Sequence, residues 1–206
     1  MTPLVNFDHL FNGNRVMVIL RGCPIDEAVL LANVAWDIGV QIVEVPLNTG
    51  TQQTTLRAVV KEGVNRGKVV GAGTTIRPED VHAAVSAGAQ YTVAPGFDPE
   101  VLAASLSAGL PHLPGIATPT ELQRACRAGC RWVKVFPAST LGPSWVKAIR
   151  GPFPHVRQVV TGGIEIATAH KYLTAGAQVV AFGARALQQR DDLEQLARDT
   201  RTLADL

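Results

Sequence analysis

The sequence predicts an α/β protein, a single (β/α)8 TIM barrel that begins with a short helix. Short aliphatic runs recur along the chain, and most of them follow a glycine that would end a helix in the left-handed conformation. Eight strand–helix units of roughly 20–28 residues fit into 206 residues, within the size range of α/β barrels. The alternative is an open doubly wound sheet. It is disfavoured because the chain lacks a Gly-x-Gly-x-x-Gly fingerprint and the number of strands is even.

The expected strands are rich in β-branched and aliphatic residues, as buried strands of a parallel sheet are. In order they cover residues 16–20, 42–45, 69–70, 91–94, 112–114, 131–137, 156–160 and 179–182. Glycines are expected to end the helices before six of these strands, at Gly39, Gly67, Gly88, Gly109, Gly129 and Gly176.

Helices are expected to begin at prolines that have an acidic or capping neighbour. Proline suits the first turn of a helix because the N–H that it lacks would have no partner there. The prolines concerned are Pro24, Pro78, Pro99 and Pro119. Residues 3–12 are expected to form the short leading helix. Because no linker is visible, residues 1–206 are expected to form one domain.

Composition narrows the class of protein. The net charge of +2 and the absence of a basic run give no indication of a nucleic-acid partner. No apolar run approaches the roughly 20 residues that span a bilayer, and the first 14 residues do not resemble a signal peptide, so no membrane association is expected. The odd count of three cysteines indicates reduced thiols and a cytoplasmic protein. Charged residues make up only 17%, which favours an oligomer that covers part of the surface.

Lys134 is the first candidate for chemistry. It lies between Val133 and Val135 in the expected sixth strand, and a lysine is rarely buried unless it is paired or functional. Burial disfavours the charged form and lowers the amine pKa from about 10.4. A neutral amine in a dry pocket is a nucleophile for a carbonyl carbon. The alternative is a surface-edge or ion-paired lysine without a catalytic role.

Glu44 is the second candidate. It lies between Val43 and Val45 in the second strand, so we expect it to point into the barrel, as Lys134 does. A carboxylate near an amine in a shared pocket can shuttle protons, and the titrations of the two groups would be coupled. The alternative is a structural ion pair between the two, although such buried bridges often contribute little net stability.

The carboxyl ends of the other strands supply candidate substrate contacts, because barrel enzymes place their working residues there. Arg21 could bind a carboxylate through its planar fork, or form a salt bridge across the rim. Thr74 could donate to the same anion, or cap the following helix. Pro95 and Thr161 end the fourth and seventh strands and are expected beside the substrate. The rim has no histidine cluster and no carboxylate pair, so no metal is expected.

A glycine and a second small residue follow each of the last two strands. Gly162 and Gly163 follow the seventh strand, and Gly183 and Ala184 follow the eighth. Loops at these two places commonly bind phosphate in this architecture. Tight-turn geometry is the alternative explanation for each pair, and the position at the rim favours phosphate.

Five motifs in this order resemble those of the class I aldolases that cleave 2-keto-3-deoxy-6-phosphogluconate and 2-keto-3-deoxy-6-phosphogalactonate. They are Ile-Leu-Arg-Gly at 19–22, Val-Glu-Val-Pro-Leu-Asn at 43–48, Gly-Ala-Gly-Thr at 71–74, Pro-Gly-Ile-Ala-Thr-Pro-Thr-Glu at 114–121 and Lys-Val-Phe-Pro-Ala at 134–138. The resemblance implies that Lys134 forms a Schiff base, Glu44 is the general acid/base, and Arg21 and Thr74 bind substrate. It also implies a homotrimer that works on a small keto sugar acid without a cofactor.

The segments 44–48 and 134–143 look most similar to the phosphogalactonate branch. The expected reaction is therefore cleavage of 2-dehydro-3-deoxy-6-phosphogalactonate to pyruvate and glyceraldehyde 3-phosphate. An aldolase for 2-dehydro-3-deoxy-6-phosphogluconate or 4-hydroxy-2-oxoglutarate is the alternative. Two further hypotheses compete with an aldolase. One is a metal-free phosphate-binding barrel of another reaction class, such as a thiamine-phosphate-synthase-like transferase or an isomerase, and the second is a non-catalytic sugar-phosphate-binding barrel.

Ala184 departs from the pattern, because the resembling enzymes usually have Gly-Ser there. The missing hydroxyl is expected to weaken phosphate binding and to narrow the preference for phosphorylated substrate.

Overall fold

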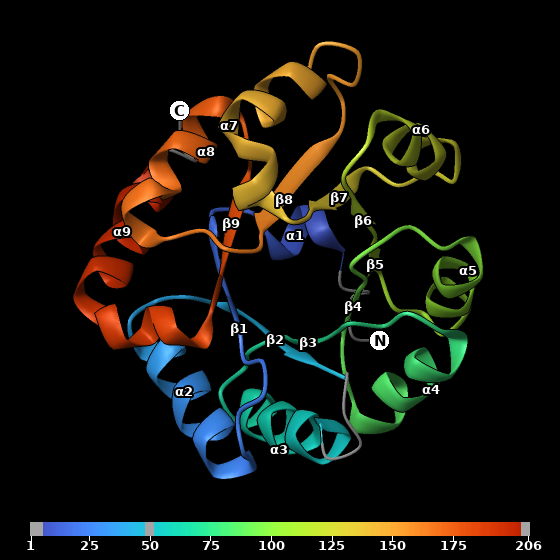
Figure 1. Cartoon of the computed structure of the whole chain (residues 1–206). Coiled ribbons are helices and arrows are strands. Elements are labelled where there is room, and N and C mark those ends of the chain that lie inside the picture. The colour runs from blue at the N-terminus through green and yellow to red at the C-terminus, as the bar shows by residue number, and fades with distance from the viewer. Residues whose placement is uncertain (1–5, 48–51, 203–206) are drawn as a thin grey trace.

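The computed structural model describes residues 6–47 and 52–202, and it shows parallel strands surrounded by helices (Figure 1). The sheet follows the order β5-β4-β3-β2-β1-β9-β8-β7-β6 and forms a nearly closed barrel, which confirms the predicted fold class. The strands are β1 Val16–Ile19, β2 Ile42–Pro46, β3 Val70–Gly73, β4 Thr92–Val93, β5 His112–Leu113, β6 Gly115–Ile116, β7 Trp132–Val135, β8 Arg157–Thr161 and β9 Val179–Gly183.

Nine strands occupy eight positions because Pro114 interrupts the expected fifth strand. Proline has no N–H to give to the ladder, so the strand is divided there. The part before it, β5, pairs with β4, and the part after it, β6, pairs with β7. The carbonyl of Pro114 still accepts from the backbone N–H of Lys134 at 2.8 Å. The divided strand therefore joins the two edges of the sheet and holds Lys134 in register.

Apart from the short α1, the helices and short 3-10 turns cover the outside of the barrel. Pro78, Pro99 and Pro119 each occupy the first turn of a helix, and Pro24 directly precedes one, as the sequence predicts. The elements are α1 Phe7–Leu10, α2 Ile25–Asp37, α3 Gln52–Asn65, α4 Pro78–Ala87, α5 Pro99–Ser107, α6 Pro119–Arg127, α7 Ala138–Ile149, η1 Ile166–Thr168, α8 Ala169–Ala175, η2 Ala184–Gln189 and α9 Arg190–Thr202.

The glycines predicted to end helices all have a positive φ. This backbone region is open to glycine at little cost, whereas a side chain there is strained. The values are 91° at Gly39, 64° at Gly67, 85° at Gly88, 75° at Gly109, 86° at Gly129 and 107° at Gly176.

The leading helix is shorter than predicted. In the part of residues 3–12 that is described, only Phe7–Leu10 is helical, and residues 3–5 lie outside the described range. Asn6 begins the helix by accepting from the backbone N–H of His9 at 2.7 Å. The chain then turns through Gly13, whose φ is 69°. The short α1 lies behind the ring of strands, at the amino end of the barrel (Figure 1).

Two apolar layers hold the fold together. One lies between the strands and the surrounding helices. The other fills the barrel itself, where Phe7 and Phe11 from the α1 segment pack against side chains from the strands. The barrel-filling side chains include Met17, Ile19, Ile42, Tyr91, Val93, Leu113, Trp132, Val159, Val179 and Ala181. Among the described residues, no helix has the length and apolar character needed to cross a membrane.

Candidate active site

Lys134 and Glu44 both lie inside the barrel. Side chains alternate along a strand, so Lys134 shares the inward face of β7 with Trp132, and Glu44 shares that of β2 with Ile42. Only 3% of Lys134 and 1% of Glu44 is exposed to solvent. The fold therefore places one amine and one carboxyl group in the barrel interior, above the apolar layer.

Gly73 makes the room that Glu44 occupies. A β-carbon built on Gly73 would lie 1.7 Å from Oε1 of Glu44, so a larger residue at this position would displace the carboxyl group. That oxygen is buried and has no hydrogen-bond partner among the residues that the structure describes. One carboxyl oxygen is thus left with its acceptor capacity unused inside the barrel.

Burial favours the neutral form of both Lys134 and Glu44. Desolvation lowers the pKa of Lys134, with Glu44 opposing the shift and Arg21 adding to it. Desolvation also raises the pKa of Glu44, while Lys134 and Arg21 oppose that shift. The amine is then more often neutral, and the carboxyl group more often protonated, than either would be in water.

The two groups do not form a closed ion pair. No ion-pair contact of 4.0 Å or less joins Lys134 to Glu44. The amine lies 5.2 Å from the centroid of the Phe136 ring. Each group still shifts the pKa of the other, so they share one low-dielectric space without neutralising each other. The geometry therefore does not match a structural bridge, and it leaves both groups available to a bound molecule.

A cavity of about 540 Å³ opens at the carboxyl ends of β1, β8 and β9. It is lined in part by Arg21, Gly163, Gly183 and Ala184, four of the residues that the sequence proposes as substrate contacts. The structure thus brings the expected carboxylate-binding arginine and part of the expected phosphate loops to one surface.

Gly162 and Thr161 lie beside this cavity without lining it. Thr161 ends β8 and is buried, and Gly162 and Gly163 turn the chain with φ of 96° and 72°. The Gly162 carbonyl accepts from the backbone N–H of Ser139 at 3.0 Å. Tight-turn geometry therefore applies to this pair of glycines, and it is compatible with the exposure of Gly163 to the cavity.

Thr74 and Pro95 follow β3 and β4, outside the lining of this cavity. Thr74 is half-buried and has a φ of 57°, unusual for a residue with a branched side chain. It lies next to Gly73 and hence near the carboxyl group of Glu44. The structure accordingly places Thr74 on the Glu44 side of the rim and Arg21 on the side of β8 and β9.

A sequence model of the KDPG and KHG aldolases matches residues 8–199. The chain belongs to this aldolase family. It is 30% identical over 184 residues to the 2-dehydro-3-deoxy-6-phosphogalactonate aldolase of Escherichia coli, covering 89% of each chain. It is 36% identical over 170 residues to the 2-dehydro-3-deoxy-phosphogluconate aldolase of Treponema pallidum, covering 82% of this chain and 80% of that one.

A solved KDPG aldolase structure from Legionella pneumophila superposes with a TM-score of 0.81 at 27% identity, covering 97% of this chain and 98% of that one. It holds pyruvate captured as a covalent carbinolamine intermediate. Membership of the KDPG and KHG aldolase family makes the chain a class I aldolase, a carbon–carbon lyase. At 30–36% identity to relatives with different sugar acids, the family does not identify the epimer that this aldolase cleaves.

Three polar residues that line the cavity of about 540 Å³ were missed by the sequence analysis, namely Glu165, Arg185 and Gln189. Arg185 and Gln189 come from η2 and line the same cavity as Arg21. The sequence pattern pointed to Gly183 and Ala184 and not to the residues after them. The signal that could have found Arg185 is its position, since it directly follows a loop that the architecture assigns to anion binding.

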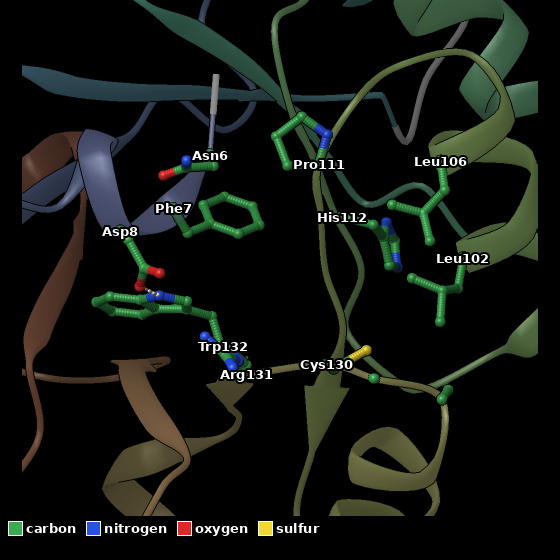
Figure 2. Close-up of a pocket in the computed structure, with 12 residues that line it drawn as sticks. Asn6, Phe7, Asp8, Leu102, Leu106, Pro111, His112, Cys130, Arg131 and Trp132 are labelled. Carbon is green, nitrogen blue, oxygen red and sulfur yellow. Dashed lines mark hydrogen bonds between the residues drawn. The ribbon is translucent and has the colours of Figure 1, made fainter. Parts of the chain in front are cut away.

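A separate cavity of about 210 Å³ lies at the amino end of the barrel (Figure 2). Phe7 and Trp132 form one wall, and Leu102 and His112 lie opposite them. The indole N–H of Trp132 donates to Asp8 at 2.7 Å. Burial lowers the pKa of His112 to about 4, so this imidazole is neutral at pH 7. This cavity lies at the opposite end of the barrel from the carboxyl ends of the strands.

Among the described residues, no group of three or more His, Cys, Asp or Glu side chains could hold a metal ion.

Gly73→Ala is expected to lower kcat by about 100-fold, because the new methyl group would displace the carboxyl group of Glu44. The φ of Gly73 is not positive, so the backbone itself accepts alanine. Overpacking should also cost about 1–3 kcal/mol of stability. Aldol-cleavage kinetics and thermal unfolding measure the two effects. Gly96→Ala is the matched control, because a β-carbon at Gly96 would meet no atom within 4 Å. A wild-type kcat in Gly73→Ala would show that Glu44 does not occupy this position during turnover.

Proposed function

We propose that this aldolase cleaves 2-dehydro-3-deoxy-6-phosphogalactonate to pyruvate and glyceraldehyde 3-phosphate through a Schiff base on Lys134. One observation carries the proposal. Lys134 is a buried amine with a lowered pKa, and it shares the barrel interior with Glu44, whose Oε1 has no hydrogen-bond partner among the described residues. The relative that holds pyruvate as a carbinolamine supports the same covalent step here.

The neutral amine of Lys134 attacks the C2 ketone and forms a carbinolamine. Glu44 gives a proton to the departing hydroxyl, which leaves as water, and an iminium remains. Glu44, now a carboxylate, takes the proton of the C4 hydroxyl. The C3–C4 bond breaks, its electron pair moves toward the iminium to give an enamine, and the aldehyde leaves. Protonation at C3 and hydrolysis by water release pyruvate and restore the amine. No metal or other cofactor enters these steps.

The substrate has an anionic group at each end, and the proposed contacts match them. Arg21 and Thr74 hold the carboxylate next to C2, because the charge of Arg21 reaches both Lys134 and Glu44. Pro95 and Thr161 border the sugar chain between its ends. The phosphate lies at the loops that follow β8 and β9, formed by Gly162, Gly163, Gly183 and Ala184.

The choice of the galactonate epimer rests on the segments 44–48 and 134–143, which resemble that branch. Asn48 lies outside the described residues. Cleavage of the gluconate epimer or of 4-hydroxy-2-oxoglutarate is the alternative. Retro-aldol assays on both phosphorylated epimers and on 4-hydroxy-2-oxoglutarate decide between them. Activity should persist in EDTA. If EDTA removes activity and a divalent metal restores it, the metal-free mechanism is wrong.

Borohydride reduction in the presence of pyruvate tests the covalent step directly. The expected result is a pyruvate adduct on the peptide that contains Lys134, identified by mass spectrometry. The absence of an adduct would leave two alternatives, a metal-free phosphate-binding barrel of another reaction class and a non-catalytic sugar-phosphate-binding barrel.

Arg21→Lys is expected to raise KM about tenfold or more, because lysine keeps the charge but loses the bidentate fork. The substrate carboxylate is present with or without phosphate, so KM should rise for both forms of the acid. Steady-state kinetics with the phosphorylated and unphosphorylated acids provide the measurement. An unchanged KM for both would give Arg21 a structural role in place of carboxylate binding.

We further propose that the enzyme is a cytoplasmic homotrimer. Ile76, Val85 and Leu106 support an assembly, because these large apolar side chains are exposed on or next to the neighbouring helices α4 and α5. The mass of the protein in solution, measured by light scattering, tests the trimer.

A further inference from the structure

Arg185 is a cation at the mouth of the cavity that the proposed mechanism has not used. It follows Ala184 directly, is exposed to solvent and lines the same cavity as Arg21, Gly163 and Gly183. Within residues 6–47 and 52–202, no carboxylate forms an ion pair with Arg185. Its guanidinium is therefore free to bind an anionic group that enters the cavity.

Arg21 and Arg185 differ in their electrostatic effect on Lys134 and Glu44. The charge of Arg21 shifts the pKa of both Lys134 and Glu44, whereas Arg185 is not among the charges that shift either one. Coulomb interactions weaken with distance and with exposure to solvent. Neither Lys134 nor Glu44 lines this cavity, and Arg21 is the arginine of its lining whose charge acts on both of them.

The charge of the cavity suits an anion. Its ionisable lining consists of Arg21, Arg185 and Glu165, which gives a net side-chain charge of +1 before substrate binds. A planar guanidinium can bind a phosphate through two parallel hydrogen bonds. The methyl side chain of the adjacent Ala184 offers no hydrogen bond, which leaves Arg185 as the side-chain donor at that point of the chain.

We propose that Arg185 binds the phosphate of the substrate and determines the preference of this aldolase for phosphorylated acids. The inference rests on the proposed function, since it assigns the far end of the same substrate. The guanidinium of Arg185 supplies hydrogen bonds to the phosphate in place of the one that a serine hydroxyl at position 184 would make. The preference for phosphorylated acids is therefore maintained. The narrowed preference expected from Ala184 alone should then emerge only when Arg185 is also changed.

Arg185→Gln is expected to lower kcat/KM for the phosphorylated acid by about 10- to 100-fold, the effect of losing a hydrogen bond to a charged group. The value for the unphosphorylated acid should stay within about twofold, because that acid has no group at this position. Arg185→Lys should fall between the wild type and Arg185→Gln, since the charge remains and the fork is lost. Arg190→Gln is the matched control. Arg190 is an exposed arginine five positions further on that does not line the cavity.

Binding of inorganic phosphate, measured by calorimetry, gives a readout that does not depend on catalysis. Arg185→Gln should raise the Kd of phosphate about tenfold or more, and Arg190→Gln should leave it unchanged. Equal losses of kcat/KM for both acids would place Arg185 at the carboxylate or give it a structural role, and would overturn the proposal. An unchanged Kd in Arg185→Gln would overturn it as well.

The failure of the proposed function has a different signature. In that case Lys134 would form no pyruvate adduct in the wild type or in any of the Arg185 variants. The phosphate titrations would still decide whether Arg185 binds the anion. If the adduct forms and the wild type and Arg185→Gln bind phosphate with the same Kd, the Schiff-base chemistry stands and only the assignment of Arg185 is wrong.

Discussion

Lys134→Met is expected to abolish aldol cleavage, because methionine has no amine to form the Schiff base. The substitution keeps a long unbranched side chain in the space that Lys134 occupies, and that side chain is only 3% exposed. Retro-aldol assays should show no turnover above background, and borohydride with pyruvate should leave no adduct on the peptide that spans position 134. The loss should be complete for both epimers and for unphosphorylated acids, since all of them use the C2 ketone.

Stability provides the control for this variant. Burying a charged amine carries a desolvation cost, and methionine removes it. In the wild type, Lys134 opposes the rise in the pKa of Glu44 that burial causes. Without the amine, the pKa of Glu44 should rise further, and its carboxyl group should bind a proton and become neutral. The Tm should therefore be unchanged or higher than that of the wild type. Residual turnover in a folded Lys134→Met protein would assign the nucleophile to another residue.

Glu44→Gln is expected to lower kcat by about 10²- to 10⁴-fold, which is the usual contribution of a positioned acid or base. Glutamine keeps the shape of the side chain but cannot exchange a proton. The carboxyl oxygen next to Gly73 has no hydrogen-bond partner among the described residues, so the fold loses no observed side-chain contact at that atom. Pre-steady-state kinetics should show that carbinolamine dehydration and C3–C4 cleavage are both slowed. A near-wild-type kcat would remove Glu44 from the mechanism.

The same variant makes a prediction about the pKa of Lys134. Glu44 raises that pKa through its negative charge, against the lowering caused by burial and by Arg21. Removing the carboxylate removes the raising contribution, so the pKa of Lys134 should fall further. The neutral amine would then persist to lower pH, and the midpoint for pyruvate adduct formation should move toward acid. Borohydride trapping across a pH series provides this midpoint. A shift toward alkali would contradict the electrostatic coupling inferred from the structure.

The barrel could be predicted from sequence because its signals are local. Glycine can adopt the positive φ that ends a helix before a strand, as Gly88 does. Proline suits the first turn of a helix in any fold, as Pro99 does. Strand alternation alone also predicts that Lys134 and Glu44 face away from the valines on either side of them. These features depend on each residue and its near neighbours in the chain, so they can be recognised without coordinates.

The features that sequence analysis missed depend on contacts between distant segments. The space for Glu44 comes from Gly73, 29 positions later, and only the register of β2 against β3 brings them together. The cavity that joins Arg21 to Arg185 exists because β1 pairs with β9. The direction of each pKa shift depends on burial and on charges from other strands. The local signals predict that the barrel forms, but the pairing of distant segments across the whole chain decides which side chains meet inside it.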